Sequence, residues 1–136
     1  MRDDKCPSTG KKIRVLIVSD RLIDQAKRLE EYFRRTESID VVGLAVDKQQ
    51  ALDVARNHSF DYLIIAGYLK AERTYSVIEE LQKQQKKFLT VHWAILDALI
   101  FSFCQRYKIP LQFERSLPLE DFVGFLMDHS PGYHSA

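Results

Sequence analysis

Short apolar runs alternate along this chain with stretches in which apolar residues recur at helical spacing. Tyr62-Leu63-Ile64-Ile65 follows Asp61, and Ala66-Gly67 closes the run. A short apolar run bounded by polar and turn residues is typical of a strand covered on both faces. Such strands occur in parallel sheets that have helices on either side.

The same pattern predicts five strands and five helices in alternation. The strands cover 13–18, 39–46, 60–67, 88–93 and 111–113, and the helices cover 22–33, 48–57, 71–86, 94–107 and 118–128. Short connections and right-handed crossovers then favour a doubly wound α/β sheet. The expected strand order is 2-1-3-4-5, the flavodoxin-like arrangement.

Length and composition indicate one globular domain. The 136 residues are 46% hydrophobic and 29% charged, and the net charge of +1 attracts neither nucleic acid nor an anionic membrane. We expect a flexible leader over 1–12, the domain over 13–128 and a tail over 129–136. The polar start is no secretory signal and no stretch approaches membrane-spanning length, so a cytoplasmic location is predicted. Cys6 and Cys104 are expected to be free thiols.

The carboxyl end of the third strand carries a residue without chemical function. In an open parallel sheet, ligands and chemistry lie just beyond the carboxyl ends of the strands. For this strand the position is Ala66. A methyl group cannot act as nucleophile, base, metal ligand or hydrogen-bond donor.

Local sequence adds a family resemblance to this pattern. Leu119-Glu120-Asp121-Phe122-Val123-Gly124 resembles the start of the last helix in receiver domains of bacterial two-component response regulators. The stretch 29–46 is similar to sporulation-type receivers, and the resemblance covers about residues 12–128. It implies the receiver fold and a role in signal transduction.

The resemblance also assigns positions to the phosphorylation chemistry of receivers. The acidic pair that helps to hold Mg²⁺ corresponds to Ser19 and Asp20, and the phosphoaccepting aspartate corresponds to Ala66. The Thr or Ser that hydrogen-bonds the phosphoryl group corresponds to Trp93, and the lysine after the fifth strand corresponds to Arg115. Only Asp20 is retained in kind, and only Arg115 is retained in the sign of its charge.

These replacements imply a degenerate receiver. Mg²⁺ is usually held through carboxylates and phosphate oxygens, and an acyl phosphate needs an acceptor carboxylate. Trp93 and Tyr68 are large enough to occupy the phosphoryl position. We therefore expect no catalytic residue, no metal and no cofactor. Asp20 is expected to cap the first helix or to pair with Arg115, with a residual cation ligand as the alternative.

Other residues with reactive side chains lack the partners that a reaction needs. His92 ends the fourth strand without a matched nucleophile and is interpreted as a structural residue. Ser19 lacks a nucleophile elbow and an evident triad. Cys104 is interpreted as a packing residue. His129 and His134 flank a tail segment where metal binding is not expected. No Gly-rich phosphate cradle follows the first strand.

The predicted fourth helix carries an apolar residue outside its inward stripe. We expect Ile95, Leu96, Leu99, Ile100 and Phe103 to face inward and Phe101 to face outward. The helix is either broadly buried or partly covered by another chain. In receivers, the fourth helix, fifth strand and fifth helix form the surface for dimerisation and output contacts. The predicted interaction residues are Ile95, Leu96, Ile100, Phe101, Tyr107, Phe122 and Phe125.

Three functions are compatible with the sequence. The first is a non-enzymatic, non-phosphorylatable signalling module that binds a response regulator, kinase or transcription factor and forms a homodimer. The second is a sensor that binds a small ligand in the vacated phosphorylation pocket. The third is an enzyme on the flavodoxin-like fold, which no group of residues supports. Fold alone does not separate these functions.

Overall fold

The computed structural model describes residues 12–19, 23–66, 76–84 and 87–129. Five parallel strands form one sheet in the order β2-β1-β3-β4-β5. The strands are β1 (Ile13–Val18), β2 (Ile39–Ala45), β3 (Tyr62–Ala66), β4 (Leu89–Ala94) and β5 (Leu111–Glu114). The predicted doubly wound sheet and its strand order are therefore confirmed.

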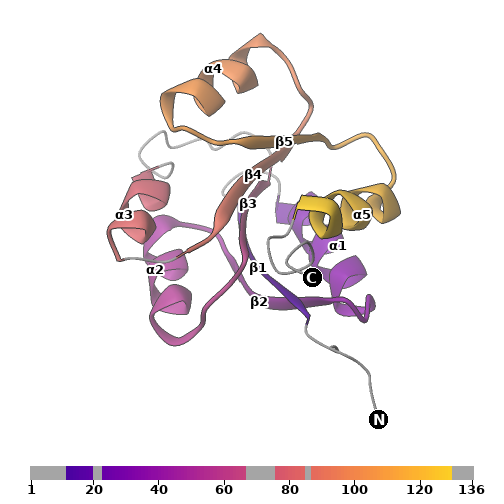
Figure 1. The fold of residues 1–136 in the computed structure, drawn as a ribbon, viewed down its shortest axis with the longest axis horizontal. Helices are drawn as coiled ribbons and strands as arrows, with labels where there is room; N and C mark the ends of the chain where they lie inside the picture. The colour runs from indigo at the N-terminus through magenta and orange to yellow at the C-terminus, as the bar shows by residue number, and fades with distance from the viewer. Residues whose placement is uncertain (1–11, 20–22, 67–75, 85–86, 130–136) are drawn as a thin grey trace.

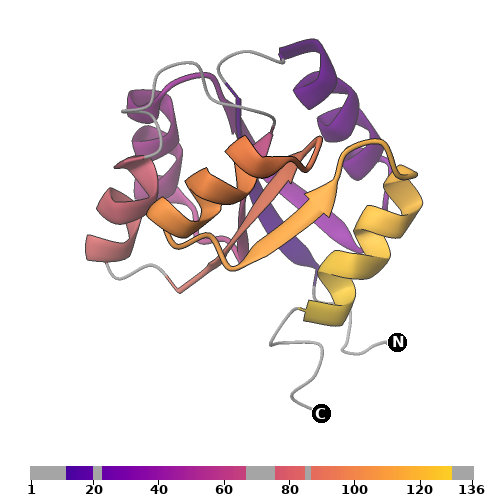
Figure 2. The same cartoon turned by 90° about the horizontal axis from the view of Figure 1, so that it is seen from above.

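Five helices alternate with the strands. They are α1 (Ile23–Arg34), α2 (Lys48–Asn57), α3 (Val77–Lys83), α4 (Ala98–Arg106) and α5 (Leu119–His129). In Figure 1 the sheet separates α2 and α3 from α1 and α5, and Figure 2 shows α4 beside β5 at one end of the sheet. Among the described residues, no helix is long and apolar enough to cross a membrane.

Some sequence predictions differ from these bounds or fall outside the described residues. The fourth helix begins at Ala98, whereas the sequence pattern predicts a start at residue 94. Helix α5 includes His129, which the sequence pattern places in the tail. The leader over 1–11, Cys6, the capping role of Asp20, the first turns of the predicted third helix and the tail from 130 lie outside the described residues.

The central strand β3 is buried over its whole length, and its side chains divide between two cores. Tyr62, Ile64 and Ala66 belong to a cluster formed with α1 and α5. Leu63 and Ile65 belong to a second cluster formed with α2, α3 and α4. Successive residues of a strand point to opposite faces, so an entirely apolar strand requires a helical layer on each side.

Backbone contacts position the neighbours of β3. Asp61 makes two hydrogen bonds with the backbone of Arg14 in β1. The Asp61 amide donates to the Arg14 carbonyl at 2.8 Å, and the Asp61 carboxylate accepts from the Arg14 amide at 2.9 Å. On β2, a Cβ at Gly43 would lie 3.0 Å from Val54 Cγ2 of α2. The missing side chain of Gly43 therefore permits the close approach of α2 to the sheet.

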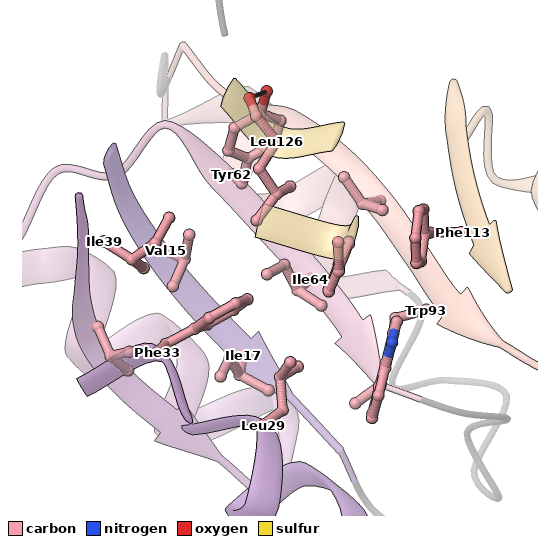
Figure 3. Packing of buried hydrophobic residues seen from close by; sticks show 14 of the residues in the cluster. Val15, Ile17, Leu29, Phe33, Ile39, Tyr62, Ile64, Trp93, Phe113 and Leu126 are labelled. Carbon is pink, nitrogen blue, oxygen red and sulfur yellow. Dashed lines mark hydrogen bonds between the residues drawn. The ribbon is translucent and has the colours of Figure 1, made fainter. Parts of the chain in front are cut away.

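A buried hydroxyl ties β3 to the last helix. The Tyr62 side chain is fully buried, and its hydroxyl donates a hydrogen bond to the Leu126 carbonyl of α5 at 2.5 Å (Figure 3). Desolvation, followed by the nearby Asp61 charge, raises the pKa of Tyr62 far above its usual value. The phenol therefore stays protonated and serves as a permanent donor across 64 residues of sequence.

Tyr62→Phe should lower the free energy of unfolding by about 1–3 kcal/mol, because the buried Leu126 carbonyl loses its donor. Urea unfolding at neutral pH measures this change. Tyr32→Phe in α1 is the matched control, since Tyr32 is half-buried and its hydroxyl has no hydrogen bond among the described residues. Equal stabilities for the Tyr62 variant and the parent protein would contradict the proposed role of this bond.

Candidate functional site

Three of the predicted site residues lie in one row at the carboxyl edge of the sheet. Ala66 of β3 pairs with Trp93 of β4. Val18 pairs with Ile65, so Ser19 is level with Ala66 on the other side, and the Ser19 amide continues the sheet by donating to the Ala45 carbonyl at 2.9 Å. The structure therefore brings Ser19, Ala66 and Trp93 together as the sequence predicted, with Ala66 in the middle.

Trp93 belongs to the core. Its side chain is only 2% exposed and lies among the core residues drawn in Figure 3. Ala66 belongs to the same cluster. The indole stacks on Phe122 of α5 with a centroid distance of 6.1 Å and an interplanar angle of 8°. Phe122 stacks in turn on Phe113 of β5 at 4.8 Å. The ring at this edge is thus held by packing against both α5 and β5.

Two polar atoms of this row are buried without a partner among the described residues. They are Ser19 Oγ and Trp93 Nε1, and each belongs to a side chain that is at least 98% buried. A buried polar atom that makes no hydrogen bond costs about 1–3 kcal/mol. A hydroxyl and an indole N–H can each donate a hydrogen bond to a small acceptor, whereas the methyl of Ala66 can take no part in group transfer.

Arg115 follows β5 and is half-exposed. Its amide donates to the Ala94 carbonyl at 2.8 Å, which places it next to the end of β4. No ion pair involves its guanidinium within the described part of the chain. Asp20, the expected partner, lies outside the described residues. Nor do the described ranges contain a cluster of three side chains that could hold a metal ion.

Sequence reasoning missed Glu114, which organises the connection between β4 and α4. Its carboxylate accepts hydrogen bonds from the Leu96 amide at 3.0 Å and from the Ser116 hydroxyl at 3.0 Å. The Leu96 amide is the main cause that lowers the pKa of Glu114, with smaller contributions from Ser116 and Arg115. Leu96 is 18 residues away in sequence, so no local pattern could have revealed this contact.

His92 is completely buried in the middle of the sheet. Its neighbours Val91 and Trp93 belong to the core on the α1 and α5 side, so His92 points toward the opposite face. Desolvation lowers the pKa of His92 from 6.5 to about 4. The imidazole is therefore neutral at physiological pH. Its interpretation as a structural residue stays a prediction.

The face of α4 differs from the predicted stripe. Ile100 and Cys104 point inward at 3% and 6% exposure, whereas Ile95 and Leu99 are 45% and 51% exposed. The difference follows from the late start of the helix: Asp97 caps it by accepting from the Ile100 amide at 2.9 Å. The buried thiol of Cys104 fits the predicted packing role, and burial raises its pKa to about 11.

The predicted interaction surface therefore needs correction. Ile100 and Phe122 are buried in the two cores and cannot contact a partner. Leu96, Tyr107 and Phe125 are half-buried and pack against the same cores. Only Ile95 and Phe101 of the seven residues are exposed, and Phe101 is 48% exposed as its outward position predicted. The helical pattern identified apolar residues correctly but could not show which of them the sheet covers.

Solved structures of receiver domains share this fold over most of both chains. The receiver domain of the response regulator NarL from Mycobacterium tuberculosis has a TM-score of 0.71 at 16% identity, covering 87% of this chain and 95% of that chain. A chain of the CheX–CheY–BeF3–Mg²⁺ complex from Borrelia burgdorferi has a TM-score of 0.70 at 17% identity, covering 90% and 92%. The receiver domain of an HD domain-containing protein from Pseudomonas fluorescens Pf-5 has a TM-score of 0.71 at 14% identity, covering 93% and 100%.

No protein-family model and no curated protein sequence matches this chain. The structural matches establish that the chain has the receiver fold, as the resemblance implied. At these identities they establish the fold alone.

The buried His92 should make the protein less stable in mild acid. The unfolded imidazole takes up a proton as pH falls through 6.5, whereas the folded one stays neutral until about pH 4. The contribution of neutral His92 to the free energy of unfolding is therefore fully present above pH 6.5, and it decreases as the pH falls below that value. Between about pH 7.5 and about pH 5, His92 alone should lower the free energy of unfolding by about 2 kcal/mol.

Urea unfolding at both pH values tests this expectation. His92→Gln should remove about 2 kcal/mol of the pH dependence, whatever its effect on stability at neutral pH. His58→Gln, at the exposed end of α2, is the control for replacing a histidine that lies outside the core. The same pH dependence in the His92 variant and the parent would show that another group is responsible.

Proposed function

We propose that this protein is a receiver-fold signalling module that cannot be phosphorylated and that acts without enzymatic activity by binding other proteins. The observation that carries the proposal is the pair at the centre of the carboxyl edge. Ala66 ends the central strand where receivers have the acceptor aspartate, and Trp93 beside it is packed into the core against Phe122. This arrangement favours a degenerate receiver, in which the fold was retained after the phosphorylation chemistry was lost.

Energetics support the same proposal. An acyl phosphate requires a carboxylate, which Ala66 lacks. An indole held by α5 and β5 would have to leave the core to make room for a phosphoryl group. Exposing a large apolar side chain to water costs about 1.5–3 kcal/mol. Arg115 retains the positive charge of the site, but a cation alone gives neither an acceptor nor a metal site.

The exposed residues of α4 support an interaction role. Ile95, Leu99 and Phe101 are three large apolar side chains on or next to one nine-residue helix, each about half exposed. We take these exposed apolar side chains as candidate contact residues. One of the similar structures is a complex of CheY with CheX. By analogy, this chain would occupy a partner such as a response regulator, a kinase or a transcription factor, or pair with a second copy of itself.

A second candidate function is the sensing of a small ligand at the same edge. It is favoured by the buried Ser19 Oγ and Trp93 Nε1, which have no partner among the described residues. A thermal-shift screen read together with the fluorescence of Trp93, the single tryptophan, distinguishes the two functions. A compound that saturates both signals, and loses its effect in Ser19→Ala, would favour the sensor.

Incubation with acetyl phosphate and Mg²⁺, or with beryllofluoride and Mg²⁺, should leave the protein unchanged. Intact-mass spectrometry should detect no phosphoryl adduct and the NMR spectrum should not shift, because Ala66 offers no acceptor oxygen. A receiver with its aspartate serves as the positive control. A stoichiometric adduct at the carboxyl edge of the sheet would refute the proposed loss of phosphorylation.

Restoring the aspartate alone should not restore phosphorylation. Ala66→Asp still lacks the carboxylate that Ser19 replaces, and Trp93 still occupies the site. The triple variant Ser19→Asp, Ala66→Asp, Trp93→Thr has the residue types of receivers and should be labelled faster, although the loss of the indole from the core should destabilise it by about 3–5 kcal/mol.

Labelling by acetyl phosphate, followed by mass spectrometry at a temperature where all variants are folded, measures both rates. Ala66→Asp combined with Trp93→Phe is a control that keeps an aromatic ring in the core. If the single variant were labelled as fast as the triple variant, Trp93 and Ser19 would not be what disables the site.

A further inference from the structure

A groove with a volume of about 540 Å³ lies between α4 and the outer strand β5, which Figure 2 shows side by side. Its apolar lining consists of Ala98 and Phe101 of α4 and of Ile109, which precedes β5. Because β5 is the last strand of the sheet, no further described strand covers this side. Sites for small organic molecules usually measure about 300–1,000 Å³, so the groove is large enough for such a ligand.

The polar part of the lining carries no charge. It consists of the Ser102 hydroxyl, the Gln105 and Gln112 amides and the Cys104 thiol. Burial raises the pKa of this thiol to about 11, so the thiol is protonated at neutral pH. A charged ligand would lose water here without gaining an opposite charge from a lining residue. The lining therefore favours a neutral ligand.

One of the two amides is held in a fixed orientation. Gln112 lies in β5, and its Nε2 donates a hydrogen bond to the Ile109 carbonyl at 2.9 Å. The side chain is half-buried, and its Oε1 accepts no hydrogen bond from another described residue. An amide that is already oriented loses little conformational freedom when a ligand binds. Gln112 Oε1 is therefore a preorganised acceptor for an N–H donor.

We propose that this groove binds a small, neutral, flat molecule that carries an amide N–H, as the rings of lactams and nucleobases do. The N–H donates to Gln112 Oε1, and the flat face of the ligand lies against the Phe101 ring, of which 48% is exposed in the free protein. Ile109 and Ala98 cover the apolar part of the ligand. This inference goes beyond the proposed function, which needs no ligand between α4 and β5.

The groove is separate from the row of residues at the carboxyl edge. Gln112 and Phe113 are consecutive in β5, so their side chains point to opposite faces of the sheet. Phe113 and Trp93 belong to the core on the side of α1 and α5, whereas Gln112 borders the groove on the side of α4. A ligand in the groove and the Trp93 indole therefore lie on opposite faces of the sheet, and the two sites can be tested independently.

Three probes of similar size test the chemistry of the ligand in an NMR titration of the full chain. Benzamide is neutral and has an N–H, and it should shift the backbone amide signals of Ser102 and Gln105 and the side-chain amide signal of Gln112. Its dissociation constant should be on the order of 1 mM, as expected for a ligand of about nine non-hydrogen atoms. Benzoate, which is anionic, and acetophenone, which is neutral but has no N–H, should each bind about tenfold more weakly or less.

Two variants test the residues of the site. Gln112→Leu removes the acceptor and should raise the dissociation constant of benzamide about tenfold or more. Gln82→Leu on α3 is the matched control, since Gln82 is exposed and lies outside the groove, and it should leave the dissociation constant unchanged. Phe101→Ala should also weaken benzamide binding, and its exposed position makes unfolding of this variant unexpected. Thermal unfolding of each variant checks that the fold is intact.

Three results would overturn the inference. They are the absence of shifts in these signals at about 10 mM benzamide, equal binding of benzamide and acetophenone, and benzamide binding that neither Gln112→Leu nor Phe101→Ala weakens. Shifts confined to Ser19, Ala66 and Trp93 would also overturn it, because they would place the probe at the carboxyl edge and favour the sensor described above. None of these results bears on the acetyl phosphate experiment, so the groove site and the proposed loss of phosphorylation can fail separately.

Discussion

The burial of β3 on both faces is the constraint on which the rest of this structure depends. Tyr62, Ile64 and Ala66 point into one core and Leu63 and Ile65 point into the other, and none of them is more than 1% exposed. A strand without a polar side is stable only at the centre of a sheet with helices on each face. For this reason the connecting helices pack on both faces of the sheet, and β3 ends in the middle of its carboxyl edge. In phosphorylated receivers, the acceptor aspartate lies at the corresponding position.

The carboxyl edge of the sheet continues the apolar core on the side of α1 and α5. The methyl of Ala66 lies between Ser19 and Trp93, and the indole continues the core through Phe122 to Phe113. Ser19 Oγ and Trp93 Nε1 are buried in this edge and make no hydrogen bond to another described residue. Ser19 and Trp93 thus bring polar atoms to this edge, while the contacts of the Trp93 ring are with aromatic side chains.

The surface of the molecule depends on where α4 begins. Ala94 stays in the sheet because it pairs with Glu114 of β5, and Glu114 also holds the Leu96 amide. Asp97 then caps a helix whose inward side is Ile100 and Cys104. A start four residues earlier would have buried a different set of side chains. The exposed Phe101 and the groove beside it are thus consequences of contacts made by β5.

The sequence by itself determined the five strands and their order, the absence of a reactive group at Ala66 and the outward position of Phe101. The strand order follows from short, right-handed crossover connections. The strands themselves, the inert methyl of Ala66 and the position of Phe101 follow from local apolar runs, residue chemistry and helical spacing, which act over a few neighbouring residues. Only the tertiary structure decided that α4 starts at Ala98, that Ile100 and Phe122 are core residues and that His92 is fully buried. Helical spacing identifies an apolar stripe but not the surface that covers it. Contacts such as Glu114 with Leu96 and Tyr62 with Leu126 join residues 18 and 64 positions apart, so they form only when the sheet brings those residues together.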